Sequence, residues 1–177
     1  VSAGGDHTCG LTNAGAIDCF GSDGYGQSNG GKPKLPKTAG ETFVGVSAGG
    51  AHTCGLTNAG AIECFGRDDY GQSNGGKPKL PTTKGETFVA ISAGRAHTCG
   101  VTSAGAIECF GFDGNGNSPS NGYKPKLPTT EGETFVGVSV GTFYTCGLTS
   151  AMAIECFGDL RRKPYVFGIR ANHYAIR

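Results

Sequence analysis

The sequence repeats one cysteine-bearing segment four times, and this repetition limits the possible folds more than any other feature. HTCGLTNAGAIDCF starts at His7 and returns almost unchanged from His52 and His97, and a fourth copy, YTCGLTSAMAIECF, starts at Tyr144. The copies are 45, 45 and then 47 residues apart. Such periods are typical of solenoids, propellers and other arrays, in which neighbouring units bury one another's apolar faces. We therefore expect one repeat domain over residues 1–177, with units at about 1–45, 46–90, 91–137 and a truncated 138–177.

Each unit carries the signals of β-strands rather than helices. Glycine, threonine and β-branched residues dominate it, and no apolar stripe has helical spacing. In the second unit, 41–46, 53–57 and 61–65 read as strands, and hairpin centres such as 13–15 suit a type I turn followed by a glycine bulge. Beyond the hairpin, Pro33 and Pro36 allow at most an edge strand. Three internal strands and one edge strand per unit predict an all-β propeller, or a propeller segment, of four blades.

The eight cysteines fit this hairpin. Folding the first copy about residue 14 sets Cys9 opposite Cys19 and Leu11 opposite Ile17, with both pairs on one face. Directly opposed Cβ atoms approach disulfide distance, and such a bridge contributes roughly 3 kcal/mol by constraining the unfolded chain. We predict one disulfide in each hairpin: Cys9–Cys19, Cys54–Cys64, Cys99–Cys109 and Cys146–Cys156.

The cysteine pairs also bear on the compartment. An even count at regular spacing is typical of a disulfide framework, so we expect a secreted protein or one in another oxidising extracytoplasmic or organelle-lumen compartment. Two alternatives stay open. Zinc favours cysteines about two to four residues apart, whereas these lie ten apart, and buried free thiols would pack as small apolar side chains.

At this point the unit resembles that of a known family. VSAGGDHTCGLTNAGAIDCFGSDGYGQ is similar to the repeat of the regulator of chromosome condensation family, and the similarity rests on dispersed positions that recur together. In the first unit these are Ala3, Gly4, His7, Leu11, Gly15, Gly21, Gly26 and Gln27. The resemblance implies a β-propeller of four-stranded blades. It implies no functional residue, because family members serve as GTPase exchange factors, as β-lactamase inhibitors and as scaffolds, with no repeat-wide motif for any of these roles.

The sequence departs from the family pattern at several positions. Phenylalanine stands in place of the usual tryptophan, at Phe20, Phe65, Phe110 and Phe157. The fourth unit has Tyr144 in place of the histidine and Met152 in place of the turn glycine, and its polar loop is short. Because family propellers commonly have seven blades, four units leave the closure of the ring open.

Charge and residue pattern argue against several classes of function. The chain has 15 basic and 14 acidic residues, so no global field draws it to nucleic acid, and no apolar run is long enough to insert into a membrane. No serine, cysteine or lysine has a recognisable activating partner. The hairpin acids occur one per unit rather than as a catalytic pair: Asp18, Glu63, Glu108 and Glu155. We expect a protein with no catalytic residue, cofactor or metal.

Two residue sets invite a metal hypothesis. His7, His52 and His97 occupy one equivalent position, but neighbouring blades would hold them too far apart to share an ion. We expect each ring to hydrogen-bond a neighbouring loop. The second set lies in glycine-rich loops without the alternating oxygen ligands of a calcium site, so we expect a turn-forming role: Asp23, Asp68, Asp69 and Asp113.

The repeated polar loops are the best candidates for binding. A Lys-Pro-Lys element recurs in three units, and a tyrosine precedes it in two. The candidate binding residues are Tyr25, Lys32, Lys34, Tyr70, Lys77, Lys79, Lys124 and Lys126. Three cationic loops could line one rim and meet an anionic partner, and the tyrosines could add interface contacts. The alternative is a solvated loop that keeps the protein soluble.

These observations predict a binding or scaffold protein whose partner is another protein and which works as an accessory subunit of a larger assembly. The alternative function is a carbohydrate- or polyanion-binding module, for example for a sulfated glycan, that uses the Lys-Pro-Lys loops.

The chain opens inside a repeat, so we expect a processed chain or a fragment. An open stack exposes two apolar faces. Three arrangements would cover these faces: closure of the ring through residues 166–169, pairing with a second copy, or docking on a larger assembly through residues 161–163.

Overall fold

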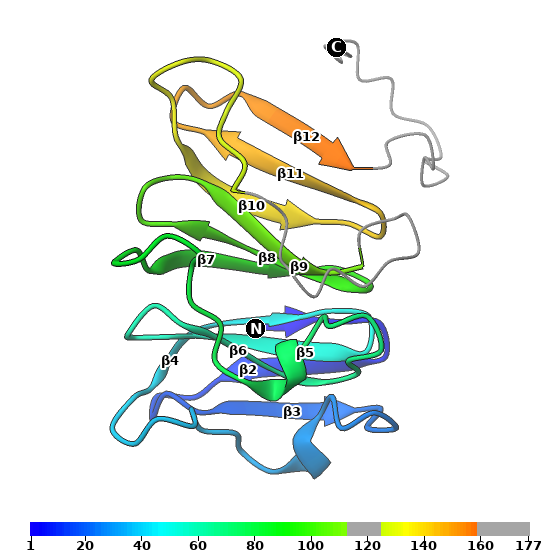
Figure 1. The fold of residues 1–177 in the computed structure, drawn as a ribbon. Helices are drawn as coiled ribbons and strands as arrows, with labels where there is room; N and C mark the ends of the chain where they lie inside the picture. The colour runs from blue at the N-terminus through cyan, green and yellow to red at the C-terminus, as the bar shows by residue number, and fades with distance from the viewer. Residues whose placement is uncertain (113–124, 159–177) are drawn as a thin grey trace.

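The computed structural model describes residues 1–112 and 125–158, which form four antiparallel sheets of three strands each (Figure 1). We call these sheets blades 1 to 4, in chain order. The strands are β1 (Ser2–Ala3), β2 (His7–Leu11) and β3 (Ile17–Gly21); β4 (Phe43–Ala48), β5 (His52–Thr57) and β6 (Ile62–Gly66); β7 (Phe88–Ala93), β8 (His97–Thr102) and β9 (Ile107–Gly111); and β10 (Phe135–Val140), β11 (Tyr144–Thr149) and β12 (Ile154–Gly158). Short 3-10 turns, η1 (Asn29–Gly31) and η2 (Asn74–Gly76), follow blades 1 and 2.

The hairpin in each blade has the predicted register. In blade 1, Cys9 is opposite Cys19 and Leu11 is opposite Ile17. Gly15 closes the turn with φ of 72°, in the left-handed region that glycine adopts without strain. In blade 4 the same position is Met152, with φ of 64°, which is an uncommon conformation for a residue with a side chain.

All eight cysteines form the four predicted disulfides, each within one hairpin: Cys9–Cys19, Cys54–Cys64, Cys99–Cys109 and Cys146–Cys156. Their Cα atoms are 4.0–4.1 Å apart. These bridges exclude both alternatives left open by the sequence, zinc binding and free thiols. Each blade therefore carries its own covalent link between its second and third strands.

The expected fourth strand is reduced to a single bridge. Lys34 pairs with Ile17 through both backbone groups, at 2.7 and 2.8 Å, and Lys79 and Lys126 repeat this contact on the next blades. Prolines flank the paired Lys-Leu segment, and a proline has no N–H to donate to a sheet ladder. The edge strand predicted from the sequence consequently extends over one residue in each of these three blades.

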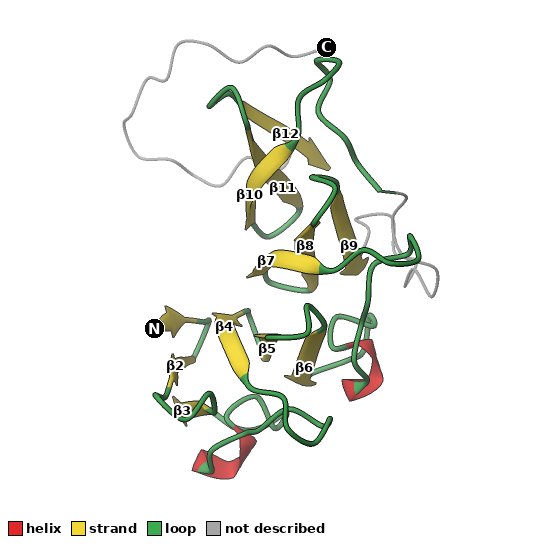
Figure 2. Ribbon diagram, turned by 90° about the vertical axis from the view of Figure 1, so that its left-hand side faces the viewer, coloured by secondary structure: helices red, strands yellow, loops and turns green. Residues whose placement is uncertain are grey.

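The blades stack face to face in chain order, with blade 1 and blade 4 at opposite ends (Figures 1 and 2). The first strands of successive blades, β1, β4, β7 and β10, lie next to one another. The third strands lie at the other edge of each sheet, where the Lys-Pro-Lys segments pair with them. The stack therefore has an inner edge formed by first strands and an outer edge formed by third strands and their loops.

The hydrophobic core lies between the blades rather than inside them. The disulfide of blade 1 packs with Ile17, with Phe43 of blade 2 and with Phe65 of blade 2. The disulfide of blade 2 packs in the same way with Phe88 and Phe110 of blade 3. Each apolar cluster thus needs two adjacent blades, as expected for a repeat protein.

Several features noted in the sequence fall outside the described residues. These are Asp113, Lys124, the basic segment 161–163 and the segment 166–169. Within the described ranges, no helix is long and apolar enough to cross a membrane.

Candidate interaction surface

The loop after blade 1 is joined to the outer strand of blade 2 along one seam. Alternate residues of β6 and its extension face blade 1, because side chains alternate along a strand. Three pairs form this seam. The Lys37 N–H donates to the Glu63 carboxylate at 3.0 and 3.2 Å. The Lys34 ammonium lies 5.9 Å from the centre of the Phe65 ring, and the Arg67 guanidinium lies 4.9 Å from the centre of the Tyr25 ring. Two of the candidate binding residues therefore contact a neighbouring blade.

The same seam recurs between later blades with different side chains. Thr82 donates its N–H and its hydroxyl to the Glu108 carboxylate, at 2.9–3.0 Å, and Thr129 does the same to Glu155. The one-per-unit acids of blades 2 to 4 thus anchor the loop of the preceding blade. Asp18, the equivalent residue of blade 1, is exposed.

The two tyrosines lie at the end of the outer strand where the polar loop begins. Tyr25 is 55% exposed and stacks on Arg67. Tyr70 is half-buried and meets the Phe112 ring edge-on, with the ring centres 5.0 Å apart. Because both rings contact the next blade, part of each tyrosine surface is used to join blades.

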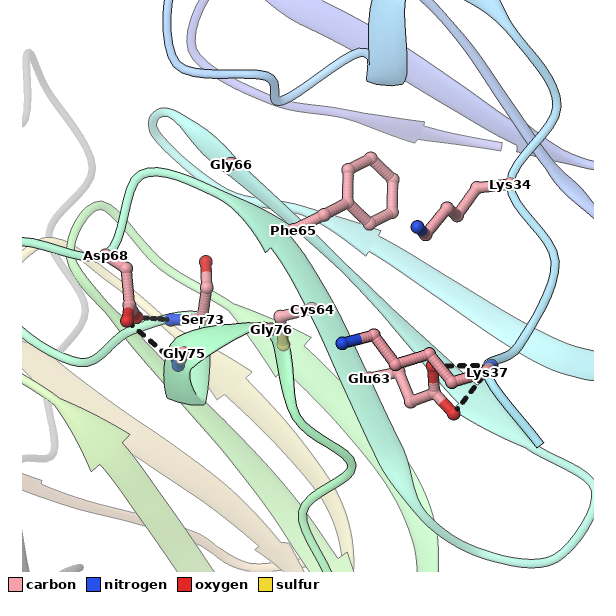
Figure 3. Close-up of a pocket in the computed structure, with 10 residues that line it drawn as sticks. All are labelled: Lys34, Lys37, Glu63, Cys64, Phe65, Gly66, Asp68, Ser73, Gly75 and Gly76. Carbon is pink, nitrogen blue, oxygen red and sulfur yellow. Dashed lines mark hydrogen bonds between the residues drawn. The ribbon is translucent and has the colours of Figure 1, made fainter.

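A pocket of about 430 Å³ opens on the seam between blades 1 and 2, as Figure 3 shows. Lys34, Lys37 and Phe65 line it together with Glu63 and Asp68. Both carboxylates are held by backbone N–H groups, Glu63 by that of Lys37 and Asp68 by those of Ser73 and Gly75, at 2.7 and 2.8 Å. Among the described residues neither lysine forms an ion pair, so the two ammonium groups are the charges this pocket offers to an anion.

A row of leucines marks the outer edge of the stack. Leu35, Leu80 and Leu127 follow the bridge-forming lysines of blades 1 to 3 and are 58%, 56% and 57% exposed. We call this surface the Leu-Lys rim. Its lysines are Lys32, Lys34, Lys77, Lys79 and Lys126. The backbone bridges to the outer strands fix the same geometry on each blade, so three apolar side chains recur beside positive charges.

The repeated histidines are buried and join adjacent blades. His7, His52 and His97 place Nε2 at 2.7, 2.8 and 3.0 Å from the hydroxyl of a threonine in the next blade. Their partners are Thr53, Thr98 and Thr145. The expected structural role is present, although the partner is a strand residue rather than a loop. The sequence did offer a signal, since each partner threonine directly follows the histidine, or Tyr144, of its own unit.

The hydrogen bonds of the threonine determine which ring nitrogen of the histidine carries the proton. The Thr98 hydroxyl donates its one proton to the Gln72 carbonyl, at 3.1 Å, so the His52 Nε2–H donates to the hydroxyl. The Nδ1 atom of His52 is buried without a partner. Burial, together with His7 and His97 nearby, lowers the pKa of His52 to about 4, and burial lowers the pKa of His97 to about 4. Burial also lowers the pKa of His7, against the opposing charges of Asp6 and Asp23.

The loop aspartates act as turn formers. Asp23 accepts the N–H groups of Ser28 and Gly30, at 2.7 and 2.9 Å, and Asp68 repeats this in blade 2. Asp69 instead pairs with Arg67 at 2.6 Å. Within the described part of the chain, no group of three or more His, Cys, Asp or Glu residues is placed to hold a metal ion.

Comparison with known proteins agrees with this architecture. Residues 1–27 and 43–72, which span the strands of blades 1 and 2 and the start of the loop after each blade, match the regulator of chromosome condensation (RCC1) repeat. These two segments of the chain therefore carry RCC1-type repeats. A comparison with curated proteins gave no match.

Solved structures with this fold come from several organisms. One is the CRINKLY WD40 ectodomain of the Arabidopsis thaliana receptor kinase ACR4, with 23% identity and a TM-score of 0.58 over 89% of this chain and 48% of that chain. Human WBSCR16 has 19% identity and a TM-score of 0.71 over 88% of this chain and 46% of that chain. Yeast RCC1 (Prp20) bound to Kap60 has 18% identity and a TM-score of 0.63 over 86% of this chain and 42% of that chain. At these identities the likeness shows the fold, an all-β stack of propeller blades. The chain spans less than half the length of each of these proteins.

Proposed function

We propose that this RCC1-type blade stack is a non-catalytic scaffold that binds another protein through the Leu-Lys rim. The observation that carries the proposal is the repetition of one exposed leucine, 56–58% accessible, at the same place on three successive blades. An apolar row bordered by charges has the composition of a protein-binding patch. In this role the chain is an accessory subunit of a larger assembly.

The comparisons support this use of the fold. Yeast RCC1 (Prp20) has been solved bound to Kap60, and Prp20p from Saccharomyces cerevisiae is described with binding properties to Gsp1p and histones. For the compartment, four disulfides and the likeness to a receptor kinase ectodomain support an oxidising extracytoplasmic location.

A charge scan with a matched control tests the rim. The triple variant Leu35→Asp/Leu80→Asp/Leu127→Asp removes the leucine row. The control changes three equally exposed valines on the inner edge of the stack: Val44→Asp/Val89→Asp/Val136→Asp, 54–57% accessible. Each purified protein, with its disulfides verified, is added to the extracellular fraction of the source organism and crosslinked to the proteins that bind it. We expect a partner that the wild type and the valine control retain and the leucine variant loses at least about tenfold. Equal retention by the leucine variant would contradict the proposal.

A second candidate function is polyanion binding at the pocket between blades 1 and 2. It is favoured by the two ammonium groups of Lys34 and Lys37 beside carboxylates that backbone N–H groups already hold. The test is elution of Lys34→Ala/Lys37→Ala from heparin, with exposed Lys84→Ala as the single-charge control. We expect the pocket variant to elute at clearly lower salt, since screened charge contacts govern such binding. If the variants elute in proportion to their charge alone, polyanion binding at this pocket is wrong.

A further inference from the structure

The two ends of the stack present faces that adjacent blades cover elsewhere. On blade 1, the face that points away from blade 2 carries Thr8, Gly10, Asp18 and Phe20, and we call it the first face. On blade 4, the face that points away from blade 3 carries Ser139, Tyr144, Cys146 and Ile154, and we call it the last face. Phe20 is 70% exposed and Ile154 is 73% exposed. The equivalent Phe110 and Ile107 are 4% and 1% exposed, because a neighbouring blade covers them.

Each blade pair inside the chain is joined by the same set of contacts. A histidine meets the next threonine, and a disulfide sulfur lies 3.4 Å from the same hydroxyl. A serine hydroxyl accepts a backbone N–H of the next blade: Ser2 from Ala48, Ser47 from Ala93 and Ser92 from Val140, at 2.9–3.0 Å. An isoleucine reaches over a glycine of the next blade, as Ile62 does over Gly100.

The first and last faces carry the two halves of this contact set. Ser139 is exposed at the serine position, and Ala3 is exposed at the N–H position. Ile154 is exposed at the isoleucine position, and the space above Gly10 is open. Tyr144 lies over Gly141 as His52 lies over Gly49, which directs its ring to the histidine position. Thr8, its counterpart on the first face, is only half-buried, whereas Thr53 and Thr98 are buried.

We propose that the last face of one copy of this chain docks on the first face of a second copy, so that two copies continue the blade stack. The occupant is another copy because the two faces complement each other and extend an interface that the chain forms three times internally. Two head-to-tail contacts related by a two-fold axis close such a pair.

The test separates the two faces by complementation. Phe20→Asp damages the first face, and Ile154→Asp damages the last face; both side chains are exposed, so each variant keeps the fold of the single chain. By sedimentation, we expect the wild-type chain to have twice its 18.0 kDa mass at about 100 μM and each variant to be a monomer. An equimolar mixture of the variants regains a dimer through one contact, because the last face of the Phe20→Asp chain and the first face of the Ile154→Asp chain are intact. This mixed dimer is weaker than that of the wild type, which has two such contacts.

Three results would overturn the proposal. The first is a wild-type monomer at this concentration. The second is an effect of only one of the two variants, which would indicate like-to-like pairing of one face. The third is a mixture that stays monomeric. Leu80→Asp, on the Leu-Lys rim, is the matched control and leaves association between copies unchanged, so failure of the rim proposal and failure of this one are distinguishable.

Discussion

The interior blade contacts and the two end faces use the same residue types and reach opposite degrees of burial. Phe110 on β9 is 4% exposed and Phe20 on β3 is 70% exposed, although both occupy the same position in equivalent hairpins. Ile107 and Ile154 differ in the same way, at 1% and 73%. A blade therefore does not bury its own apolar residues. Burial, and the stability that comes with it, is a property of two neighbouring blades.

The largest expected difference between interior and end lies in a strand glycine. A Cβ at Gly100 would come within 2.5 Å of the Phe88 ring and 2.8 Å of Ile62, whereas at Gly10 nothing lies within 4 Å. We expect Gly100→Val to lower the free energy of unfolding by roughly 3 kcal/mol or more, because the packed interface cannot move aside. Gly10→Val should change it by at most about 0.5 kcal/mol. Urea unfolding in dilute solution measures the free energy of unfolding of both variants, and equal effects would contradict the expected difference between interior and end.

The isoleucines give the next largest contrast. Ile62 is fully buried between blades 2 and 3, and Ile154 is exposed on the last face. We expect Ile62→Ala to destabilise the fold by about 2–5 kcal/mol, the range for a buried large-to-small change. Ile154→Ala should cost less than about 1 kcal/mol under conditions where the chain is monomeric. Thermal unfolding of the two variants checks this, and a cost at Ile154 that matched Ile62 would show that the last face is covered within the chain.

Lowering the pH should reduce the stability of the fold more through His52, between blades 2 and 3, than through His7, between blades 1 and 2. The pKa of His52 is about 4 in the fold and about 6.5 in the unfolded chain, so below pH 6.5 the unfolded state takes up a proton that the folded state does not. Stability is therefore lost as the pH falls from 6.5 to about 4, by up to about 3 kcal/mol from this residue. We expect His52→Gln to flatten the pH dependence of unfolding over this window, and His7→Gln to flatten it less. Parallel curves for wild type and His52→Gln would contradict the assigned burial.

The smallest contrast concerns the threonine hydroxyls. Thr98 joins His52, Gln72 and a disulfide sulfur, whereas Thr8 lies on the first face, which no other blade of the described residues covers. Thr98→Val leaves a buried donor and a buried carbonyl unpaired and should cost about 1–3 kcal/mol. Thr8→Val should be close to neutral. Chemical denaturation distinguishes them, and the double variant Thr98→Val/His52→Gln should cost less than the sum of its parts because the two residues share one hydrogen bond.

Contacts close in the sequence were predicted, and distant ones were not. The disulfides, the hairpin register and the bladed architecture followed from the residues, because Cys9 and Cys19 are ten positions apart in one hairpin and side-chain alternation sets their faces. The histidine partner was not predicted, since His7 and Thr53 are 46 positions apart. The anchoring of Glu63 by the Lys37 N–H, 26 positions away, was also missed.

The candidate binding residues divide in the same way. The sequence identified the repeated lysines and tyrosines and correctly limited the Lys-Pro-Lys segment to an edge position. Only the stacked structure shows that Lys34 lies over Phe65 and Tyr25 over Arg67, while the adjacent leucines are exposed. The sequence analysis expected a rim of cationic loops and two exposed end faces, but it did not predict the row of exposed leucines on that rim.

The sequence by itself determined what happens within a blade: the strands, the turn glycines, the four disulfides and the edge position of the Lys-Pro-Lys segment. The tertiary structure decided which of four nearly identical positions are buried, which histidines stay neutral and which apolar side chains face solvent. The physical reason is that backbone geometry is fixed by neighbouring residues, whereas burial and pKa depend on the surface that another blade brings against them.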